Sequence, residues 1–435
     1  MRFKKTTPSH SLSARSASVY FFVILGSFLA MSIHMTHVWS ADHILLDGTQ
    51  IGQGSYRLKI TGFIQPRATL HLAEPLDQLT ASNYSIYNGQ YALPNLSDDH
   101  SWGFNIARAR VMMRGSLPHS MQKVNYLLAV EMGRSIYTRG ETLVVTDIAS
   151  TFSYIPGVRL RIGQFKLPTM EEIVQPVESH QEFITFSNTL ETLLGESPIK
   201  NGEYQGAHYN FRDRGLQAFD TFALGSSFAI SYAGMVAMGH RPNPNASHHP
   251  DLIARASLSW ITKGKLKDIK RKDVNVGAWY MQGKRMFEDE EIKRIRQGAF
   301  LKVEQGAFWV LAEWVQGSNM TEIPNLIKRD HVEWAKHSQT TGIVLQGGPR
   351  FTISNKYGEI GLKTRLEQLT HQQGDPNTLQ IFQSLTAGLE WKPISRLRIQ
   401  YEYQMRKLET PNRKDDVSRL KRLGDQMLLQ ATLLF

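Results

Sequence analysis

Arginine and lysine residues recur at every second position in several stretches of this chain, separated by apolar residues. In residues 104–115, for example, Arg108 and Arg110 flank Ala109, and Val111 follows. Because successive side chains of a β-strand point to opposite sides, such a stretch carries its cations on one face and its apolar residues on the other. Guanidinium groups that line a narrow aqueous passage lower the barrier for anions, and their paired donors match the geometry of phosphate. The cations that we expect to line the passage and bind anions are Arg108, Arg110, Arg114, Arg159, Arg161, Lys166, Arg255, Lys363, Arg365, Arg396 and Arg398.

Glutamates share the predicted inward faces of the same strands. If they pair with arginines across neighbouring strands, they stiffen the wall and reduce its positive field. Two interpretations therefore stay open: a passage with a net preference for anions, and a wall whose charges largely cancel. The glutamates concerned are Glu131, Glu304, Glu313, Glu367, Glu390 and Glu402.

The stretches that position these residues have the period and length of β-strands that cross a membrane. Apolar residues alternate with polar ones over about ten residues, which is the length that a tilted membrane strand needs. In 425–435 the apolar face runs to a terminal phenylalanine, Phe435. Short and long connections alternate along the chain, as periplasmic turns and external loops do. The clearest other stretches are 104–115, 125–133, 158–163, 359–367 and 396–404.

We therefore predict an all-β protein in which residues 41–435 form a single transmembrane antiparallel β-barrel of about sixteen strands, porin-like in architecture. A soluble antiparallel sheet alternates in the same way, with its apolar residues inward. A secreted β-sandwich or adhesin is thus the alternative. Long strands, aromatic residues at strand ends and the alternating connections favour the barrel.

The first forty residues resemble a secretory signal peptide. Basic residues come first, an apolar run over 19–33 follows, and cleavage is expected after Ser40 or Ala41. The alternative is an uncleaved anchor in the inner membrane, for which the apolar run is short. We predict that residues 1–40 are removed on export through the periplasm.

Composition excludes several classes of protein. The hydrophobic fraction is 41% and the mean hydropathy is −0.32, which excludes a polytopic helical membrane protein. The chain has no cysteine, so disulfides and thiolate metal sites are excluded. Its net charge of +11 is spread over strands and not gathered on a helix with aromatic platforms, which argues against nucleic-acid binding. No metalloprotease, serine hydrolase or P-loop motif is present, so we expect neither an enzyme nor a cofactor.

The connection over 165–203 is too long for a turn and is rich in glutamate. Long connections without strands are commonly functional. We consider two hypotheses: the segment is a constriction loop that folds into the barrel with its acidic groups on lumen arginines, or it is an external lid.

Three short motifs resemble landmarks of the phosphate-selective porin O and P family, in the family's order. They are Arg-Ala-Arg-Val at 108–111, Leu-Arg-Ile-Gly-Gln-Phe-Lys-Leu-Pro at 160–168, and Arg-Asp-Arg-Gly-Leu-Gln at 212–217. The resemblance covers roughly residues 57–435. It implies a sixteen-stranded homotrimeric porin in the outer membrane of a Gram-negative bacterium. It also implies passage of anions, in some members phosphate or polyphosphate.

The predicted function is passive diffusion of small anionic solutes through the cell outer membrane, with phosphate or polyphosphate among the candidates. The alternative within transport is a general or organic-acid porin with little anion bias. Expected partners are the permeating anions, outer-membrane lipid and lipopolysaccharide, the last through the basic stretch 406–422.

Overall fold

The computed structural model describes most of the chain after residue 57. The predicted signal peptide, 1–40, and most of the basic stretch 406–422 lie outside the described residues. The described ranges are 58–72, 102–117, 123–133, 143–175, 181–194, 199–200, 203–204, 211–239, 249–264, 272–287, 290–319, 337–354, 357–372, 379–409 and 425–435.

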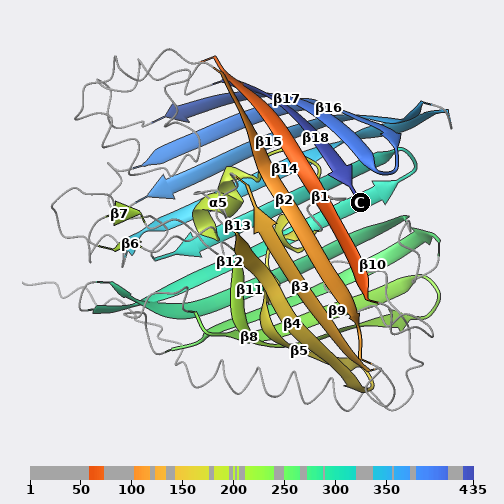
Figure 1. Ribbon diagram of the computed structural model, residues 1–435. Coiled ribbons are helices and arrows are strands. Elements are labelled where there is room, and N and C mark those ends of the chain that lie inside the picture. Colours follow the sequence, from red (N-terminus) through yellow and green to blue (C-terminus); the bar gives the residue numbers. More distant parts are fainter. Residues whose placement is uncertain are drawn as a thin grey trace, which may run out of the picture. The chain divides into compact units, whose positions relative to one another are not determined.

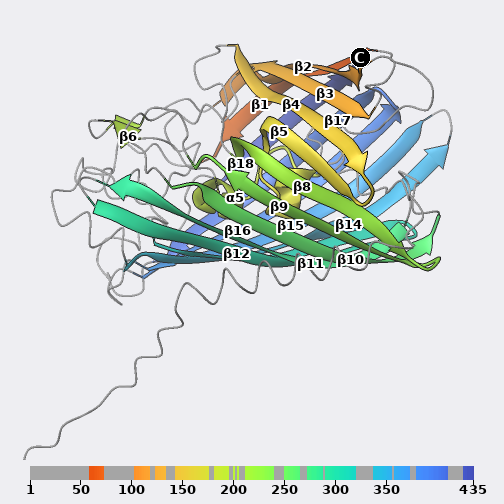
Figure 2. The same ribbon diagram turned by 90° about the horizontal axis from the view of Figure 1, so that it is seen from below.

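Sixteen antiparallel strands close into one barrel, which confirms the predicted fold class (Figures 1 and 2). Strands pair in chain order, and β1 pairs with both β2 and β18. A separate two-stranded sheet, β6 (Ile199–Lys200) with β7 (Glu203–Tyr204), lies between β5 and β8 in the sequence. The barrel strands are β1 (Lys59–His71), β2 (Trp102–Ser116), β3 (Val124–Met132), β4 (Val144–Ile155), β5 (Val158–Lys166), β8 (Arg212–Leu224), β9 (Phe228–Ala237), β10 (Asp251–Lys263), β11 (Lys272–Phe287), β12 (Glu290–Gln305), β13 (Phe308–Ser318), β14 (Gln339–Ser354), β15 (Gly358–Gln372), β16 (Gln380–Ile394), β17 (Leu397–Glu409) and β18 (Gln426–Leu434).

Among the residues that the structure describes, no helix is long and apolar enough to cross a membrane.

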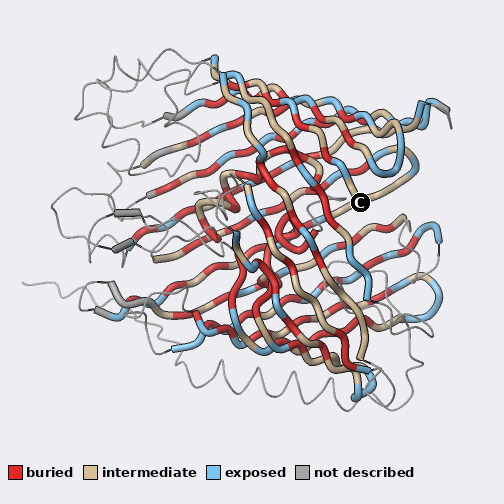
Figure 3. The backbone as a smooth tube through the Cα atoms, viewed as in Figure 1, coloured by how far each residue is buried: buried red, intermediate tan, exposed pale blue. Residues whose placement is uncertain are grey.

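Burial alternates along the strands, as Figure 3 shows. In β2, Arg110 is 3% exposed, whereas its neighbour Val111 is 41% exposed. In β17, Arg398 is buried and Tyr401 on the other face is exposed. The predicted separation of cations from apolar residues therefore holds in these strands, with the apolar set on the outer surface. This pattern makes the barrel wall polar inside and apolar outside.

One predicted facing is wrong. The alternation in 104–115 predicts Ala107 on the apolar outer face together with Ala109 and Val111, but Ala107 is only 1% exposed. Gln65 of β1 pairs with Arg108 of β2, whereas Pro66 pairs with Ile106, so a β-bulge leaves Ala107 without a partner. The extra residue resets the alternation, and Ile106 then faces outward beyond the bulge.

The barrel closes at the chain's last residue. The amide of Gly62 donates to the carbonyl oxygen of Phe435 at 2.9 Å, and the amide of Phe435 donates back to Gly62 at 3.0 Å. A Cβ atom at position 62 would collide with the Phe435 ring. Glycine at this position therefore leaves room for the terminal aromatic ring beside the junction of β1 and β18.

An apolar outer surface predicts that the barrel sits in hydrocarbon. Leu345, in the middle of β14 and exposed on the outer face, tests this. Leu345→Arg is expected to lower the free energy of unfolding by about 2–4 kcal/mol, because it places a charge in lipid. Urea-dependent folding into phospholipid vesicles measures the change.

The matched control is Leu345→Met, which keeps the side chain apolar and is expected to cost less than about 1.5 kcal/mol. Equal stability of the two variants would show that the outer surface at β14 is not in lipid.

Candidate functional site

A segment between β5 and β8 lies inside the ring of strands (Figures 1 and 2). Its described parts are 167–175 and 181–194, and they include helices α4 (Glu171–Val174) and α5 (Asn188–Leu193). We call 167–194 the internal segment. The Ser187 hydroxyl caps α5 by accepting from the Leu190 amide at 3.2 Å. Arg296 of β12 donates to the Leu193 carbonyl at the other end of α5, at 3.0 Å.

One side of the internal segment packs against the inner wall through apolar residues. Met170, Ile173, Leu190 and Leu193 are fully buried. They belong to one apolar cluster with inward-facing residues of β9 to β13. Burying such side chains stabilises each by about 1.5–3 kcal/mol, so this contact fixes where the segment lies. The wall residues of the cluster on β9 to β13 are Met235, Ala237, Ile253, Trp279, Met281 and Val315, and β1, β4 and β5 add Phe63, Ala149 and Phe165.

The opposite side of the internal segment has irregular backbone, and wall side chains supply its hydrogen bonds. Lys363 Nζ and Gln400 Nε2 donate to the Glu182 carbonyl at 2.5 and 2.9 Å. Arg67 donates to the carbonyl of Ile184 at 3.1 Å, and Glu402 accepts from the Ile184 amide at 2.7 Å. Buried backbone groups need partners. Here β1, β15 and β17 provide them.

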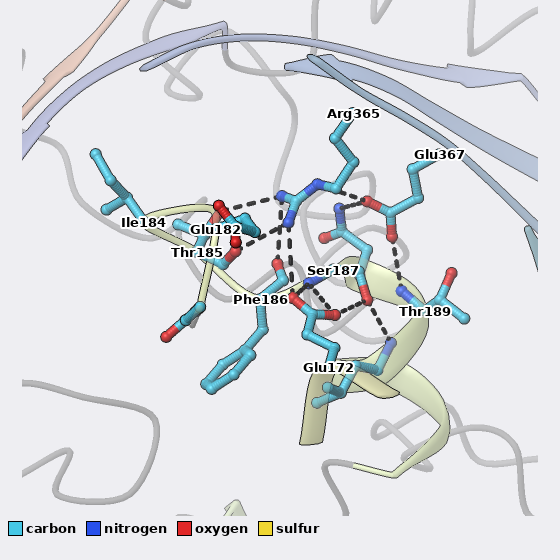
Figure 4. Close-up of polar contacts among 12 residues, drawn as sticks. Glu172, Glu182, Ile184, Thr185, Phe186, Ser187, Thr189, Arg365 and Glu367 are labelled. Atoms are coloured by element: carbon cyan, nitrogen blue, oxygen red, sulfur yellow. Dashed lines mark hydrogen bonds and ion pairs between the residues drawn. The ribbon is translucent and has the colours of Figure 1, made fainter. Parts of the chain in front are cut away.

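Arg365 of β15 is the centre of the largest of these contacts (Figure 4). Its guanidinium donates to the Thr185 carbonyl at 2.9 Å and lies 3.7 Å from the Glu172 carboxylate. Glu172 also accepts from the amide and hydroxyl of Ser187, at 3.0 and 2.6 Å. Glu367 accepts from the Thr189 amide at 2.7 Å. Arg365 thus joins α4 to β15, and Glu367 joins α5 to the same strand.

Two other acidic residues of the segment are paired with wall cations. Glu171 forms a buried ion pair with Arg255 of β10, and Glu182 forms one with Arg350 of β14. Glu171, Glu172 and Glu182 therefore face three different parts of the wall.

Two of these glutamates have pKa values that are shifted in opposite directions. Burial raises the pKa of Glu172 above its ordinary value, and Arg365 opposes the shift only in part. Burial acts on Glu182 in the same sense, but the charge of Arg350 and its hydrogen bond outweigh it and lower the pKa.

A small cavity lies between the internal segment and the wall of β2 to β5 and β8. Its volume is about 30 Å³. Of the residues that the structure describes, four cations and one carboxylate line it, and the segment contributes Pro168 and Val174. The charged residues are Arg110, Arg161, Lys166, Arg212 and Asp147.

Each of these cations is held in place by neighbours. Nε of Arg212 lies 3.0 Å from both oxygens of Asp147, and Arg110 is paired with Glu131. Arg161 lies over the rings of Phe165 and Phe219, 5.4 and 4.7 Å from their centroids. Lys166 Nζ donates to the Gln175 carbonyl at 2.7 Å. Counting Glu131 as well, the cluster keeps a positive excess.

The residues expected to line a passage thus fall into separate groups. Arg108, Arg110, Arg161 and Lys166 lie on the side of the cavity, where Arg108 donates to Gln181 at 2.7 Å. The cations Arg255, Lys363 and Arg365 hold the internal segment, and Lys363 also pairs with Glu402 at 2.6 Å.

The remaining expected residues lie elsewhere. Arg398 pairs with Glu390 at 3.7 Å, and Arg159 pairs with Asp220 at 3.3 Å. Arg114 is half-buried near the end of β2. Arg396 differs from its expected strand position, because it lies exposed in the turn between β16 and β17.

Sequence reasoning missed several inward cations, among them Arg67, Arg212 and Arg350. Arg212 begins the Arg-Asp-Arg-Gly run at 212–215, so its position next to the internal segment was a usable signal. Arg67 follows a proline, and Arg350 lies beyond a glycine pair, where the alternating pattern is broken.

Replacing Arg365 is expected to weaken the attachment of the internal segment. Arg365→Gln leaves the buried carboxylates of Glu172 and Glu367 without this cation, which costs about 3–5 kcal/mol. Urea unfolding measures the loss. Adding Glu172→Gln should recover part of it, and strictly additive effects would contradict the contact.

Glu182 and Glu172, whose pKa values are shifted in opposite directions, are expected to change the free energy of unfolding in opposite directions as the pH falls. The folded pKa of Glu182 is lowered, so its stabilisation is present above about 4.5 and is lost as pH falls further. The folded pKa of Glu172 is raised, so its ionisation opposes folding at neutral pH, and acidification removes that cost.

The measurement is the unfolding free energy of the protein relative to Glu182→Gln and to Glu172→Gln, between pH 7 and pH 3. On acidification the unfolding free energy of the unmodified protein should fall relative to that of Glu182→Gln and rise relative to that of Glu172→Gln. Parallel trends would contradict the two assignments.

Comparison with known proteins supports the fold. No family model and no curated protein matches the sequence. Among solved structures, OmpF of Salmonella typhi in complex with daunomycin has a TM-score of 0.54 at 11% identity, over 87% of this chain and 97% of that one. The anion-selective porin from Comamonas acidovorans gives 0.53 at 9% identity, over 87% and 99%. The outer-membrane channel DcaP of Acinetobacter baumannii gives 0.52 at 11%, over 88% and 99%. The barrel therefore has the fold of outer-membrane porins.

Proposed function

We propose that this chain is a porin of a Gram-negative outer membrane through which small anionic solutes diffuse passively. The porin fold and the apolar outer surface support a place in the membrane. A polar interior that is narrowed by an internal segment supports diffusion of small solutes over transport of large ones. The mechanism requires no cofactor and no energy source.

The charge of the cavity carries the preference for anions. Among the described residues there, four cations face Asp147 and Glu131, so positive charge is in excess in a site largely shielded from bulk water. Charges interact more strongly in such a site than in open solution. An entering anion is stabilised and an entering cation is repelled.

A general porin with little anion bias is the second candidate. The paired charges of the other walls favour it, because each pair nearly cancels at a distance. Examples are Arg398 with Glu390 and Lys302 with Glu304, at 3.7 and 3.2 Å.

We further propose that phosphate is preferred among the anions. This proposal draws on the resemblance to the phosphate-selective porins and on the fit of guanidinium groups to oxyanions. Assembly as a homotrimer and contact with lipopolysaccharide rest on the resemblance and on the basic stretch 406–422.

The reversal potential in a planar bilayer with a potassium chloride gradient tests anion preference. We expect the sign that corresponds to chloride over potassium. Arg161→Gln is expected to reduce the permeability ratio by about tenfold, because one charge in a shielded site is worth on the order of 1–2 kcal/mol. A preference of the unmodified protein for potassium would overturn the proposal.

A further inference from the structure

We propose that the outer face of β14 to β17 binds one diacyl phospholipid whose headgroup carries a single anionic phosphate. A groove of about 820 Å³ crosses this face and is lined mainly by residues that point away from the interior. The four strands lie side by side in the barrel wall (Figure 1). The site is thus distinct from the passage through the barrel, and the inference goes beyond the proposed function.

The register of the four strands lines up their outward side chains in rows. One row is apolar and consists of Leu345, Leu366, Leu385 and Met405. The next row lies two residues nearer the long connections and consists of Ile343, Gln368, Gln383 and Lys407. Every member of both rows lines the groove. The groove therefore changes from apolar to polar within one step along the strands.

This change in polarity marks the place of a headgroup. An outer face in hydrocarbon is apolar, and polar side chains return where the headgroups begin. Gln383 Nε2 donates to Gln368 Oε1 at 3.2 Å, so the polar row is organised across β15 and β16. Lys407 is exposed in the same row, and a lysine at this level attracts the phosphate of a lipid. The acyl chains then lie along the apolar row, with the phosphate at Lys407.

The charges of the groove favour an anionic headgroup over a zwitterionic one. Asp425 also lines the groove, but both of its oxygens are already bonded. The hydroxyl of Tyr403 donates to one at 3.1 Å, and the amide of Arg406 donates to the other at 3.3 Å. An ammonium headgroup would compete with these bonds. The amides of Gln368 and Gln383, in contrast, can exchange hydrogen bonds with the hydroxyls of a glycerol headgroup.

The volume of the groove favours a lipid with two chains. A water-sized group takes up about 30 Å³ in a liquid, so 820 Å³ has room for roughly 25 to 30 methylene groups, the hydrocarbon of about two acyl chains. Lipid A carries more chains and a second phosphate. Lys407, however, is the one exposed cation among the described residues that line the groove.

Native mass spectrometry of the purified protein in a lipid-free neutral detergent tests the ligand. Phosphatidylglycerol, phosphatidylethanolamine and lipid A are added separately at equal concentration. We expect one phosphatidylglycerol to stay bound per chain, with an affinity at least about fivefold above that of the other two lipids. Equal retention of all three lipids, or a preference for either of the other two, would overturn the proposal.

Two variants with matched controls test the location. Leu385→Trp fills the apolar row, whereas Leu301→Trp places the same ring on the exposed outer face of β12, away from the groove. We expect the first to weaken phosphatidylglycerol binding about tenfold, because the ring displaces an acyl chain, and the second by less than about twofold. Lys407→Gln is expected to weaken binding about fivefold, and Lys293→Gln, at an exposed outward lysine of β12, by less than about twofold.

Equal losses in a variant and its control would overturn the site. Heat-dependent migration on a gel shows that each variant is folded before it is measured. The reversal potential reports on anion preference and not on the outer face, so this proposal and the proposed function can fail separately.

Discussion

The structure depends on the hydrogen bonds that wall side chains make to the backbone of the internal segment. Irregular backbone inside a membrane-spanning barrel must find partners, because neither strands nor bulk water supply them. Arg67, Lys363 and Gln400 donate to its carbonyl groups, and Glu402 and Glu367 accept from its amides. These side chains are long enough to reach from the wall to the middle of the barrel. They hold this side of the segment, while the apolar cluster holds the other.

This attachment also decides what the cations of the interior do. Arg255, Lys363 and Arg365 are used to neutralise or bond the segment, so their charge is matched locally. Arg161 and Arg212 lie where cations outnumber carboxylates. Arginine is suited to both roles, since it stays charged when buried and donates in several directions. A count of inward cations therefore overstates the number that can act on a solute.

Sequence reasoning could predict the barrel because the two-residue period is local. A strand such as β2 is visible in a dozen residues, and the alternation of Arg110 with Val111 gives its facing. The bulge at Ala107 was not visible, because it depends on the register with β1. The partners of Glu171 and Glu182 were not visible either, since they lie 84 and 168 residues away in the chain. Long-range pairing of this kind needs the closed barrel.

The junction of β1 and β18 has a consequence for assembly. Gln65 and Thr432, which are hydrogen-bonded across it at 3.1 Å, are 367 residues apart in the chain. Contacts between such distant residues form slowly. Arg67 of β1 contacts Ile184 of the internal segment and also Gln430 of β18, at 2.9 Å. An internal segment that is already in place therefore holds Arg67 of β1 close to β18. We expect β1 and β18 to pair last, after the internal segment has folded inside the barrel.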